Sequence, residues 1–493
     1  MKKCGIIDSL RVIWYYAQSL QFNGEFPKDI EVHREYLRRD HIKRTTWISE
    51  WNLAILAKEV LINSEESNWN EKTFRQWKYL SSAINKIKNI EDKIAKDHID
   101  ASNLLRELER MAHGQFGWQI DRPNKILLAR YFKLYDTPEM NAIIKSTLGL
   151  ATKELFFVSI ALFSSFLQNY ALYYPLNIQI KGLDQESIDK VLKFISSEFS
   201  ALKEKLISEQ NINENYIYAY SSLQSYPIIR MEYNGTFSLV CPVPTLLFWR
   251  ITSGLYYEVV NNKDFDNAFG ASFQNHIGDC ISISNTNPDI KAYPEESFMD
   301  GKNRKNTVDW ILDDGNAAIF VECKSKRMTM PSKTELVVPD ALERDWRKMA
   351  SFVSQVYKTI RDYRSGKYPT YKYDEKKKIY PLVITLEDWH LVGDNSWLKK
   401  EIERNLNAED IPITWLSEMP YTICSTNEFE EMIQIIQSVG IDAIIGKKLD
   451  DPETASWEMA TFLLNIYPKE HEKIRNLFPE VFNSIFPEEI LKK

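Results

Sequence analysis

Hydrophobic residues recur every three or four positions along much of the first 180 residues. This spacing is typical of amphipathic helices, and Pro123, Pro138 and Pro175 separate the helical stretches. The most apolar run, Leu155–Leu167, is too short to cross a bilayer and is expected to form a buried helix. We therefore expect residues 1–180 to form a mostly α-helical N-terminal domain.

The pattern becomes mixed between residues 181 and 260. A helix is predicted over Gln185–Ser208, and two β-rich runs follow on either side of Asn234-Gly235. Asn-Gly is favoured in tight hairpin turns because both residues tolerate a positive φ. We interpret residues 181–260 as a mixed α/β connecting region.

Helix and strand patterns alternate in the rest of the chain. Between residues 261 and 390 the predicted order is helix, strand, strand, helix, strand, at Asp264–Ile281, Thr307–Asp313, Ala317–Ser325, Asp340–Arg364 and Ile379–Leu386. Strands enclosed by helices predict an α/β layer domain. Residues 391–493 are predicted to form a C-terminal α/β extension, with elements at Trp397–Leu406, Tyr421–Cys424 and Glu428–Ser438.

Composition limits the classes of protein that the chain can belong to. Its 493 residues exceed what one hydrophobic core usually organises, and its net charge of −7 requires any nucleic-acid contact to come from local basic patches. The five cysteines are scattered and form no Cys-x-x-Cys pair, which argues against a disulfide framework or a zinc ribbon. The N-terminus lacks the apolar run of a signal peptide. We expect a cytoplasmic protein without a membrane segment.

The segment Thr307–Arg327 (TVDWILDDGNAAIFVECKSKR) carries the strongest candidate chemistry. Two strand-like runs flank a turn that could centre on Asp314-Gly315 or on Gly315-Asn316. Because side chains alternate along a strand, either two-residue turn places Asp309, Glu322 and Lys324 on one face. A three-residue loop would move Asp309 to the other face.

Two carboxylates and an amine beside a strongly hydrophobic strand indicate a metal site. Buried charge needs compensation, and Mg²⁺ binds one or two carboxylates and keeps several waters. Asp309, Glu322 and the backbone carbonyl of Cys323 could hold the ion, and Lys324 could orient or deprotonate an attacking water. The alternative is an ordinary cross-strand ion pair on a half-exposed hairpin.

The pattern Asp309…Glu322-Cys323-Lys324 resembles the PD-(D/E)XK nuclease superfamily, which includes restriction endonucleases and RecB-like nucleases. The resemblance covers about residues 260–390 and implies a restriction-endonuclease-like mixed sheet flanked by helices. Val308 stands where the family name has proline. In the first core helix of the family a glutamate often follows a phenylalanine, and here that position is Gln274.

Because Gln274 is neutral where the family often has a glutamate, two interpretations of the site remain open. Another acid, with Glu295 or Glu296 as the nearest candidates, could supply the charge. Otherwise the chain could be a catalytically inactive nuclease-like scaffold that binds a protein or nucleic-acid partner.

Basic residues near the predicted site favour a polyanionic substrate. Gly301–Arg364 contains 13 Lys and Arg against 9 Asp and Glu. The candidate phosphate contacts are Lys326, Arg327, Arg347, Gln355 and Lys358, and such contacts give affinity without sequence specificity. A second basic segment, His33–Trp47, could bind a nucleic-acid strand or could be a solvated helix face.

Together these patterns predict a Mg²⁺-dependent nuclease, with Mn²⁺ as a possible substitute. DNA is the expected substrate, and RNA is left open, as are a homo-oligomer and a regulatory protein partner. The resemblance implies a role in prokaryotic restriction or phage defence.

Overall fold

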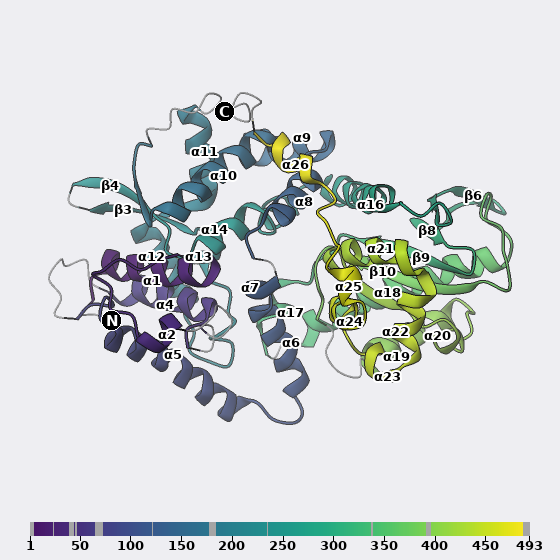
Figure 1. Ribbon diagram of the computed structural model, residues 1–493, viewed down its shortest axis with the longest axis horizontal. Coiled ribbons are helices and arrows are strands. Elements are labelled where there is room, and N and C mark those ends of the chain that lie inside the picture. Colours follow the sequence, from purple (N-terminus) through teal and green to yellow (C-terminus); the bar gives the residue numbers. More distant parts are fainter. Residues whose placement is uncertain are drawn as a thin grey trace. The chain divides into compact units, whose positions relative to one another are not determined.

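The computed structural model describes residues 4–22, 24–38, 44, 47–64, 72–120, 122–176, 184–233, 235–336, 339–390 and 396–486. The chain divides into two compact units (Figure 1). The first holds the described residues up to Phe265, Lys333–Leu336 and those from Phe478 onward. The second holds Asp266–Ser332 and the described residues from 339 to Leu477. The predicted segments 1–180 and 181–260 thus fall in the first unit, and 261–390 and 391–493 largely in the second.

The first unit is mostly helical, as the hydrophobic spacing predicts. Its longest helices pack around apolar side chains such as Leu10, Ile13, Leu53 and Leu56, all fully buried. The helices are α1 (Ile6–Gln21), α2 (Arg34–Arg38), α4 (Glu50–Asn63), α5 (Trp77–His98), α6 (Leu104–Gln115), α7 (Gly117–Ile120), α8 (Lys125–Tyr135), α9 (Pro138–Leu148), α10 (Thr152–Gln168), α11 (Gln185–Ile195), α12 (Phe199–Glu209), α13 (Ser222–Ser225), α14 (Pro244–Ile251), α15 (Leu255–Val259) and α26 (Pro479–Ser484).

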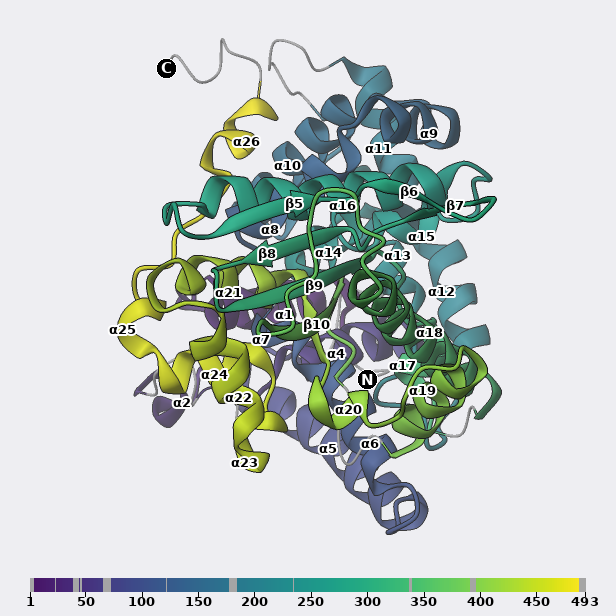
Figure 2. The same ribbon diagram turned by 90° about the vertical axis from the view of Figure 1, so that its right-hand side faces the viewer.

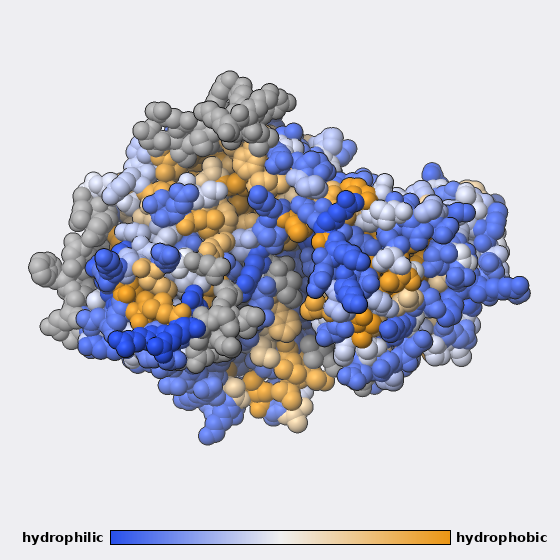
Figure 3. Space-filling view, in the orientation of Figure 1, coloured by the Kyte–Doolittle hydropathy of each residue, from blue (hydrophilic) through white to orange (hydrophobic). Residues whose placement is uncertain are grey.

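The apolar run Leu155–Leu167 is a buried helix, as predicted. It forms most of α10, whose Phe156, Val158 and Leu162 are fully buried. No single helix of the described residues is long and apolar enough to cross a membrane; α9 and α10 reach that length only as a pair, bent by 65°. On the face shown in Figure 3, most of the second unit's surface is hydrophilic and its apolar residues form small patches.

A small sheet in the first unit corrects one predicted helix. Helix Gln185–Ser208 is wrong as a single element, because β2 (Ser196–Glu198) separates α11 from α12 and pairs in parallel with β3 (Ile228–Tyr233). Sheet pairing here outweighs local helix propensity. The predicted hairpin is confirmed, since β3 pairs antiparallel with β4 (Thr236–Val240). Asn234 of its turn lies outside the described residues. Strand β1 (Ala171–Tyr173) completes the order β1-β4-β3-β2.

The second unit is a mixed α/β layer structure. Its described strands form a five-stranded sheet in the order β11-β10-β9-β8-β5 and a separate β6–β7 hairpin. The strands are β5 (Lys291–Pro294), β6 (Ser297–Asp300), β7 (Asn303–Asn306), β8 (Trp310–Asp313), β9 (Ala317–Lys324), β10 (Lys378–Thr385) and β11 (Thr422–Ser425). The helices are α16 (Phe265–Ser284), α17 (Met330–Thr334), α18 (Pro339–Arg364), α19 (Ser396–Ala408), α20 (Trp415–Glu418), α21 (Thr426–Val439), the π-helix η1 (Asp442–Gly446), α22 (Lys447–Asp450), α23 (Pro452–Ala455), α24 (Met459–Ile466) and α25 (Pro468–His471).

Strand direction changes within the five-stranded sheet. Strands β5, β8 and β9 lie side by side and antiparallel (Figure 2), whereas β9, β10 and β11 are parallel. The parallel step from β9 to β10 needs a long crossover, and α18 supplies it. Strand β10 is buried on both faces apart from its first residue, as expected for a central strand covered by helices.

Helix α18 covers one face of this sheet. Its stripe of Met349, Val353, Val356, Tyr357 and Ile360 is fully buried against Ala318 and Phe320 of β9, which confirms the predicted core positions. The sixth predicted member, Trp346, is only partly buried.

Helix α16 covers the opposite face and depends on a glycine. Because side chains alternate along β8, Trp310 points away from the face on which Ile311 packs with Phe320. Gly278 of α16 lies beneath the Trp310 ring, so a Cβ at that position would collide with it. The Trp310 Nε1–H also donates to the carbonyl of Gln274 (3.3 Å). The helix is therefore fixed closely to the strand that follows Asp309.

We expect Gly278→Ala to destabilise the second unit by about 1–3 kcal/mol, because the added methyl overpacks a tight contact. Gly270→Ala is the matched control on the same helix, since its Cβ would meet nothing within 4 Å. The control should be neutral or stabilise by up to about 1 kcal/mol, because alanine is the better helix former. Urea unfolding measures both, and equal stabilities for the two variants would contradict this packing.

Candidate active site

The β8–β9 hairpin has one of the two predicted turns. Trp310 pairs with Val321 and Asp313 with Ala318, so Gly315-Asn316 is the two-residue turn. The N–H of Asp314 donates to the carbonyl of Ala317 (3.1 Å), and Gly315 has a φ of 91°. A positive φ at the first central residue is what a type II′ turn requires. Continuing this register brings Asp309 level with Glu322.

Asp309 itself lies in a bend just before β8. The predicted strand Thr307–Asp313 is thus too long. Strand β8 begins only at Trp310, and the three residues between Asn306 and Trp310 belong to no strand. The Asp309 carboxylate nevertheless reaches the second strand, since its Oδ2 accepts a hydrogen bond from the N–H of Cys323 at 2.6 Å. This bond fixes the side chain beside the Glu322-Cys323-Lys324 segment.

Glu322 and Lys324 form a buried ion pair at the end of β9. The Lys324 Nζ lies 2.5 Å from Glu322 Oε1, with side-chain exposures of 19% and 2%. Lys324 also donates to Oε1 of Gln355 on α18, at 3.3 Å. Gln355, predicted as a helix residue near the site, therefore contacts the amine directly.

Gln274 contacts Glu295, which lies near Asp309. The Gln274 amide donates to Oε2 of Glu295 at 3.2 Å, and Glu295 is close enough to Asp309 and Glu322 to act on both electrostatically. Glu296 is held elsewhere, because its carboxylate accepts from the hydroxyl of Thr370 at 2.6 Å. Of the two acids that sequence could not separate, Glu295 is the one near Asp309.

Electrostatics at the site are unbalanced. Asp309, Glu322 and Glu295 set three carboxylates against the single ammonium of Lys324. Burial raises the pKa of Asp309 to about 6, an effect that the Cys323 N–H and Lys324 partly oppose. Burial and the neighbouring Asp309 raise the pKa of Glu322 as well. For Lys324, burial disfavours the charge, but Glu322 and Asp309 outweigh it and raise the pKa above its ordinary value.

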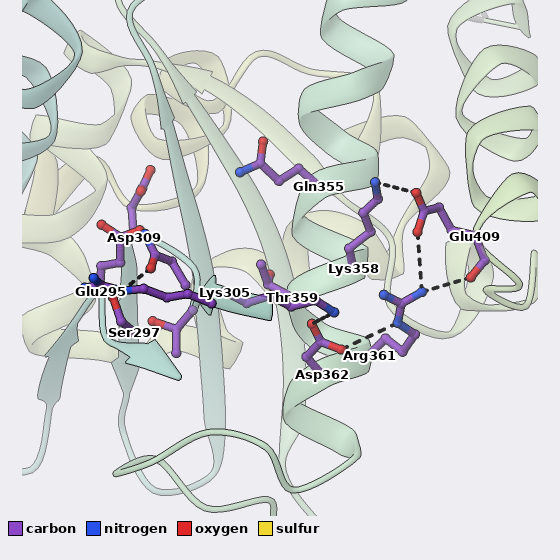
Figure 4. A pocket seen from close by; sticks show the side chains of 13 residues that line it. Glu295, Ser297, Lys305, Asp309, Gln355, Lys358, Thr359, Arg361, Asp362 and Glu409 are labelled. Carbon is purple, nitrogen blue, oxygen red and sulfur yellow. Dashed lines mark hydrogen bonds and ion pairs between the residues drawn. The ribbon is translucent and has the colours of Figure 1, made fainter. Parts of the chain in front are cut away.

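A polar pocket of about 610 Å³ opens beside Asp309 (Figure 4). Glu295 and Asp309 lie at one end of it, and α18 contributes Gln355 and Lys358. The remaining lining is Ser297, Arg304, Lys305, Asn306, Thr307, Thr359, Arg361, Asp362 and Glu409. Two basic residues of the β6–β7 hairpin, Arg304 and Lys305, also line this pocket, which no local sequence pattern indicated.

The predicted phosphate contacts are not equivalent. Lys326 is exposed just past β9, and Lys358 lies in the pocket but pairs with Glu409 at 2.6 Å. Arg347 is half exposed on α18 beside Glu343. Arg327 is only 8% exposed, and its guanidinium forms an ion pair with Glu387 at 2.5 Å. This side chain is therefore buried and is not placed to contact a phosphate. Of the predicted residues, Lys326 and Lys358 are the better placed to contact a phosphate, because Lys326 is exposed and Lys358 lines the pocket.

The basic segment His33–Trp47 lies only partly within the described residues, since 39–43, 45 and 46 fall outside them. Tyr36 is fully buried and Trp47 packs on His33 and Trp77, with ring centroids 5.0 and 6.0 Å apart. The buried ring of Tyr36 belongs to the core of the first unit, which favours a structural role for that aromatic.

A separate donor cluster was not anticipated. Among the described residues, His276, Cys280 and Glu430 are the group of three potential ligands whose donor atoms all lie within 4.8 Å of one another. The signal in sequence is a His and a Cys four residues apart, on one face of α16. Glu430 comes from α21, so no sequence spacing could have added it. All five cysteines are free, in agreement with their scattered positions.

Comparisons with protein-family models, curated proteins and solved structures returned no match to this chain.

The raised pKa of Asp309 predicts how metal-free stability depends on pH. The folded chain holds this proton more tightly than the unfolded chain, whose pKa is near the usual 3.8. The resulting stability is complete below about pH 4 and is lost as pH rises through about 6. Relative to Asp309→Asn, the unaltered protein should lose on the order of 2 kcal/mol between about pH 4 and pH 8.

Urea unfolding at the two pH values, with a chelator present, measures this difference. Adding Mg²⁺ at the higher pH should restore stability to the unaltered protein more than to Asp309→Asn. If the free energy of unfolding depends on pH in the same way in both proteins, the folded state does not raise the pKa of Asp309.

Proposed function

We propose that the second unit is a metal-dependent nuclease with a restriction-endonuclease-like core, and that it hydrolyses phosphodiester bonds of DNA. One observation carries the proposal. Asp309, Glu322 and Lys324 converge at the end of a buried strand, with Glu295 beside them, so that three carboxyl groups face one ammonium and their full ionisation would leave two negative charges uncompensated. A divalent cation is the partner that balances such a group.

The surrounding fold supports the same class. Antiparallel strands β5, β8 and β9 continue into the parallel strand β10, with α16 on one face and α18 on the other. This is a mixed sheet flanked by helices, the architecture that the resemblance to PD-(D/E)XK nucleases implies.

The donor set fits Mg²⁺, and Mn²⁺ could replace it. Asp309, Glu322 and the Cys323 carbonyl would hold the ion through oxygen, the donor that hard divalent cations prefer. When bound, Mg²⁺ supplies charge stabilisation at the phosphate and activation of the attacking water. Glu295, oriented by Gln274, would supply the acidity that Gln274 lacks.

Lys324 and Gln355 would act on the reacting groups. The Lys324 ammonium has three donors, of which Glu322 and Gln355 engage two in this structure. The remaining donor can bind a phosphate oxygen or the attacking water. Gln355 is a positioning residue, because its carbonyl oxygen fixes where the amine points.

Polyanion contacts would come from the pocket beside Asp309 and from its surroundings. Arg304 and Lys358 line the pocket, and Lys326 lies just beyond β9. Phosphate contacts of this kind make affinity salt-sensitive and do not read base sequence. A role in prokaryotic restriction or phage defence is proposed by analogy with other members of the superfamily.

We expect Mg²⁺- or Mn²⁺-dependent cleavage of single- or double-stranded DNA by the full chain. Asp309→Asn, Glu322→Gln and Lys324→Ala should each lower the cleavage rate by at least about 100-fold, the scale of losing a group that acts on the transition state. Glu295→Gln should cause a smaller loss. Cleavage is measured by gel assay with each metal, and RNA substrates are tested in parallel.

Glu296→Gln is the matched control for Glu295→Gln, because the two residues are adjacent and Glu296 binds Thr370 instead. Its cleavage rate should equal that of the unaltered chain. If neither DNA nor RNA is cut with either metal while the protein still binds nucleic acid or a protein partner, the inactive-scaffold alternative replaces the enzyme.

A further inference from the structure

Helices α16 and α21 bring a second set of possible metal ligands together within the second unit. His276 and Cys280 are one helical turn apart on α16, so both side chains leave the same face of the helix. Glu430 approaches from α21. The three residues are 1%, 0% and 7% exposed. Their side chains are therefore enclosed by the protein.

The donor atoms converge on a single point. Nε2 of His276 lies 3.0 Å from Oε1 of Glu430 and 3.6 Å from Sγ of Cys280, and all three donors lie within 4.8 Å of one another. In a tetrahedral zinc site with Zn–S of about 2.3 Å and Zn–N of about 2.0–2.1 Å, the S···N edge is about 3.6 Å. The corresponding N···O edge is roughly 3.3 Å, so a small outward shift of Glu430 would admit the ion.

The charge and the chemical type of the three donor atoms indicate which metal ion the cluster would bind. A thiolate and a carboxylate together carry two negative charges, which a divalent cation neutralises, and the imidazole binds in its neutral form. Sulfur and imidazole suit Zn²⁺, whereas Mg²⁺ prefers oxygen. On binding, the Cys280 thiol gives up its proton to solvent. The hydrogen bond between His276 Nε2 and Glu430 Oε1 is broken, and its proton leaves Nε2 as the neutral imidazole takes up the tautomer protonated at Nδ1, so that Nε2 and the carboxylate are both free to bind the ion.

We propose that His276, Cys280 and Glu430 bind one Zn²⁺ at a buried site, distinct from the carboxylate site at Asp309. Three protein ligands leave a fourth position for water or another donor. The ion would link α16 to α21.

This linkage would support the neighbouring site through α16 itself. The same helix carries Gln274, whose amide holds Glu295 and whose carbonyl accepts from Trp310, and Gly278, on which the Trp310 ring packs. His276 lies between these two positions. Zinc would therefore stiffen the helix that orients the acidic side of the Asp309 site without entering its chemistry.

The competing account is a buried His–Glu hydrogen bond with a cysteine packed beside it. It predicts no stoichiometric metal. The test uses the full chain without a polyhistidine tag, exposed to Zn²⁺, freed of excess by gel filtration and assayed by elemental mass spectrometry. We expect about one zinc per chain. Co²⁺ in place of Zn²⁺ should give the visible absorption of a thiolate-bound ion.

Matched variants assign the ion to the cluster. Cys280→Ser and His276→Gln should lower the zinc content at least 10-fold, whereas Cys424→Ser, also a buried cysteine of the second unit, should retain it. Asp309→Asn should also retain the zinc, which separates this site from the proposed nuclease centre. Removing zinc with a chelator should lower the melting temperature of the unaltered chain.

Two results would overturn the proposal. One is an unaltered protein that holds no stoichiometric zinc and gives no thiolate–cobalt absorption. The other is a Cys280→Ser protein that folds and keeps its zinc. Because zinc content is measured without a cleavage assay, loss of the nuclease proposal would leave this result unaffected.

Discussion

Burial of like charges at the end of β9 is the constraint on which the second unit depends. Asp309 and Glu322 are removed from water beside each other, and the single ammonium of Lys324 does not balance them and Glu295. A buried unpaired charge costs several kcal/mol, and evolution toward stability alone would replace it with apolar residues. Buried carboxyl groups that are retained although they destabilise the fold are typical of a functional site.

Geometry elsewhere in the unit holds these charges in place. The Gly315-Asn316 turn sets the register that brings Asp309 level with Glu322, and the Cys323 N–H fixes the Asp309 carboxylate. Helix α18 presents Gln355 to Lys324 from one face of the sheet. On the other face, the close contact of Gly278 with Trp310 fixes α16 against β8. The site is thus supported from both sides of one sheet.

Local patterns predicted much of this unit, because its elements are long and strongly periodic. The α18 stripe, the β9 strand and the hairpin follow from spacing and turn chemistry. The alternation of side chains across a two-residue turn places Asp309, Glu322 and Lys324 on one face. Sequence could not show that Ser196–Glu198 leaves a helical pattern to pair with β3, since that pairing is long-range. The sequence could not show which of Glu295 and Glu296 lies near Asp309. It also could not show that Arg327 is buried or that Glu430 approaches His276 and Cys280 of α16. Each of these is decided by tertiary packing.

The most direct test of the account is a crystal structure of the full chain grown with Mn²⁺, with the ion located by its anomalous scattering. We predict one ion bound directly by carboxylate oxygens of both Asp309 and Glu322, with the Lys324 ammonium displaced from Glu322. A structure that holds no ion there at saturating Mn²⁺, with Lys324 still paired to Glu322, would contradict the central claim.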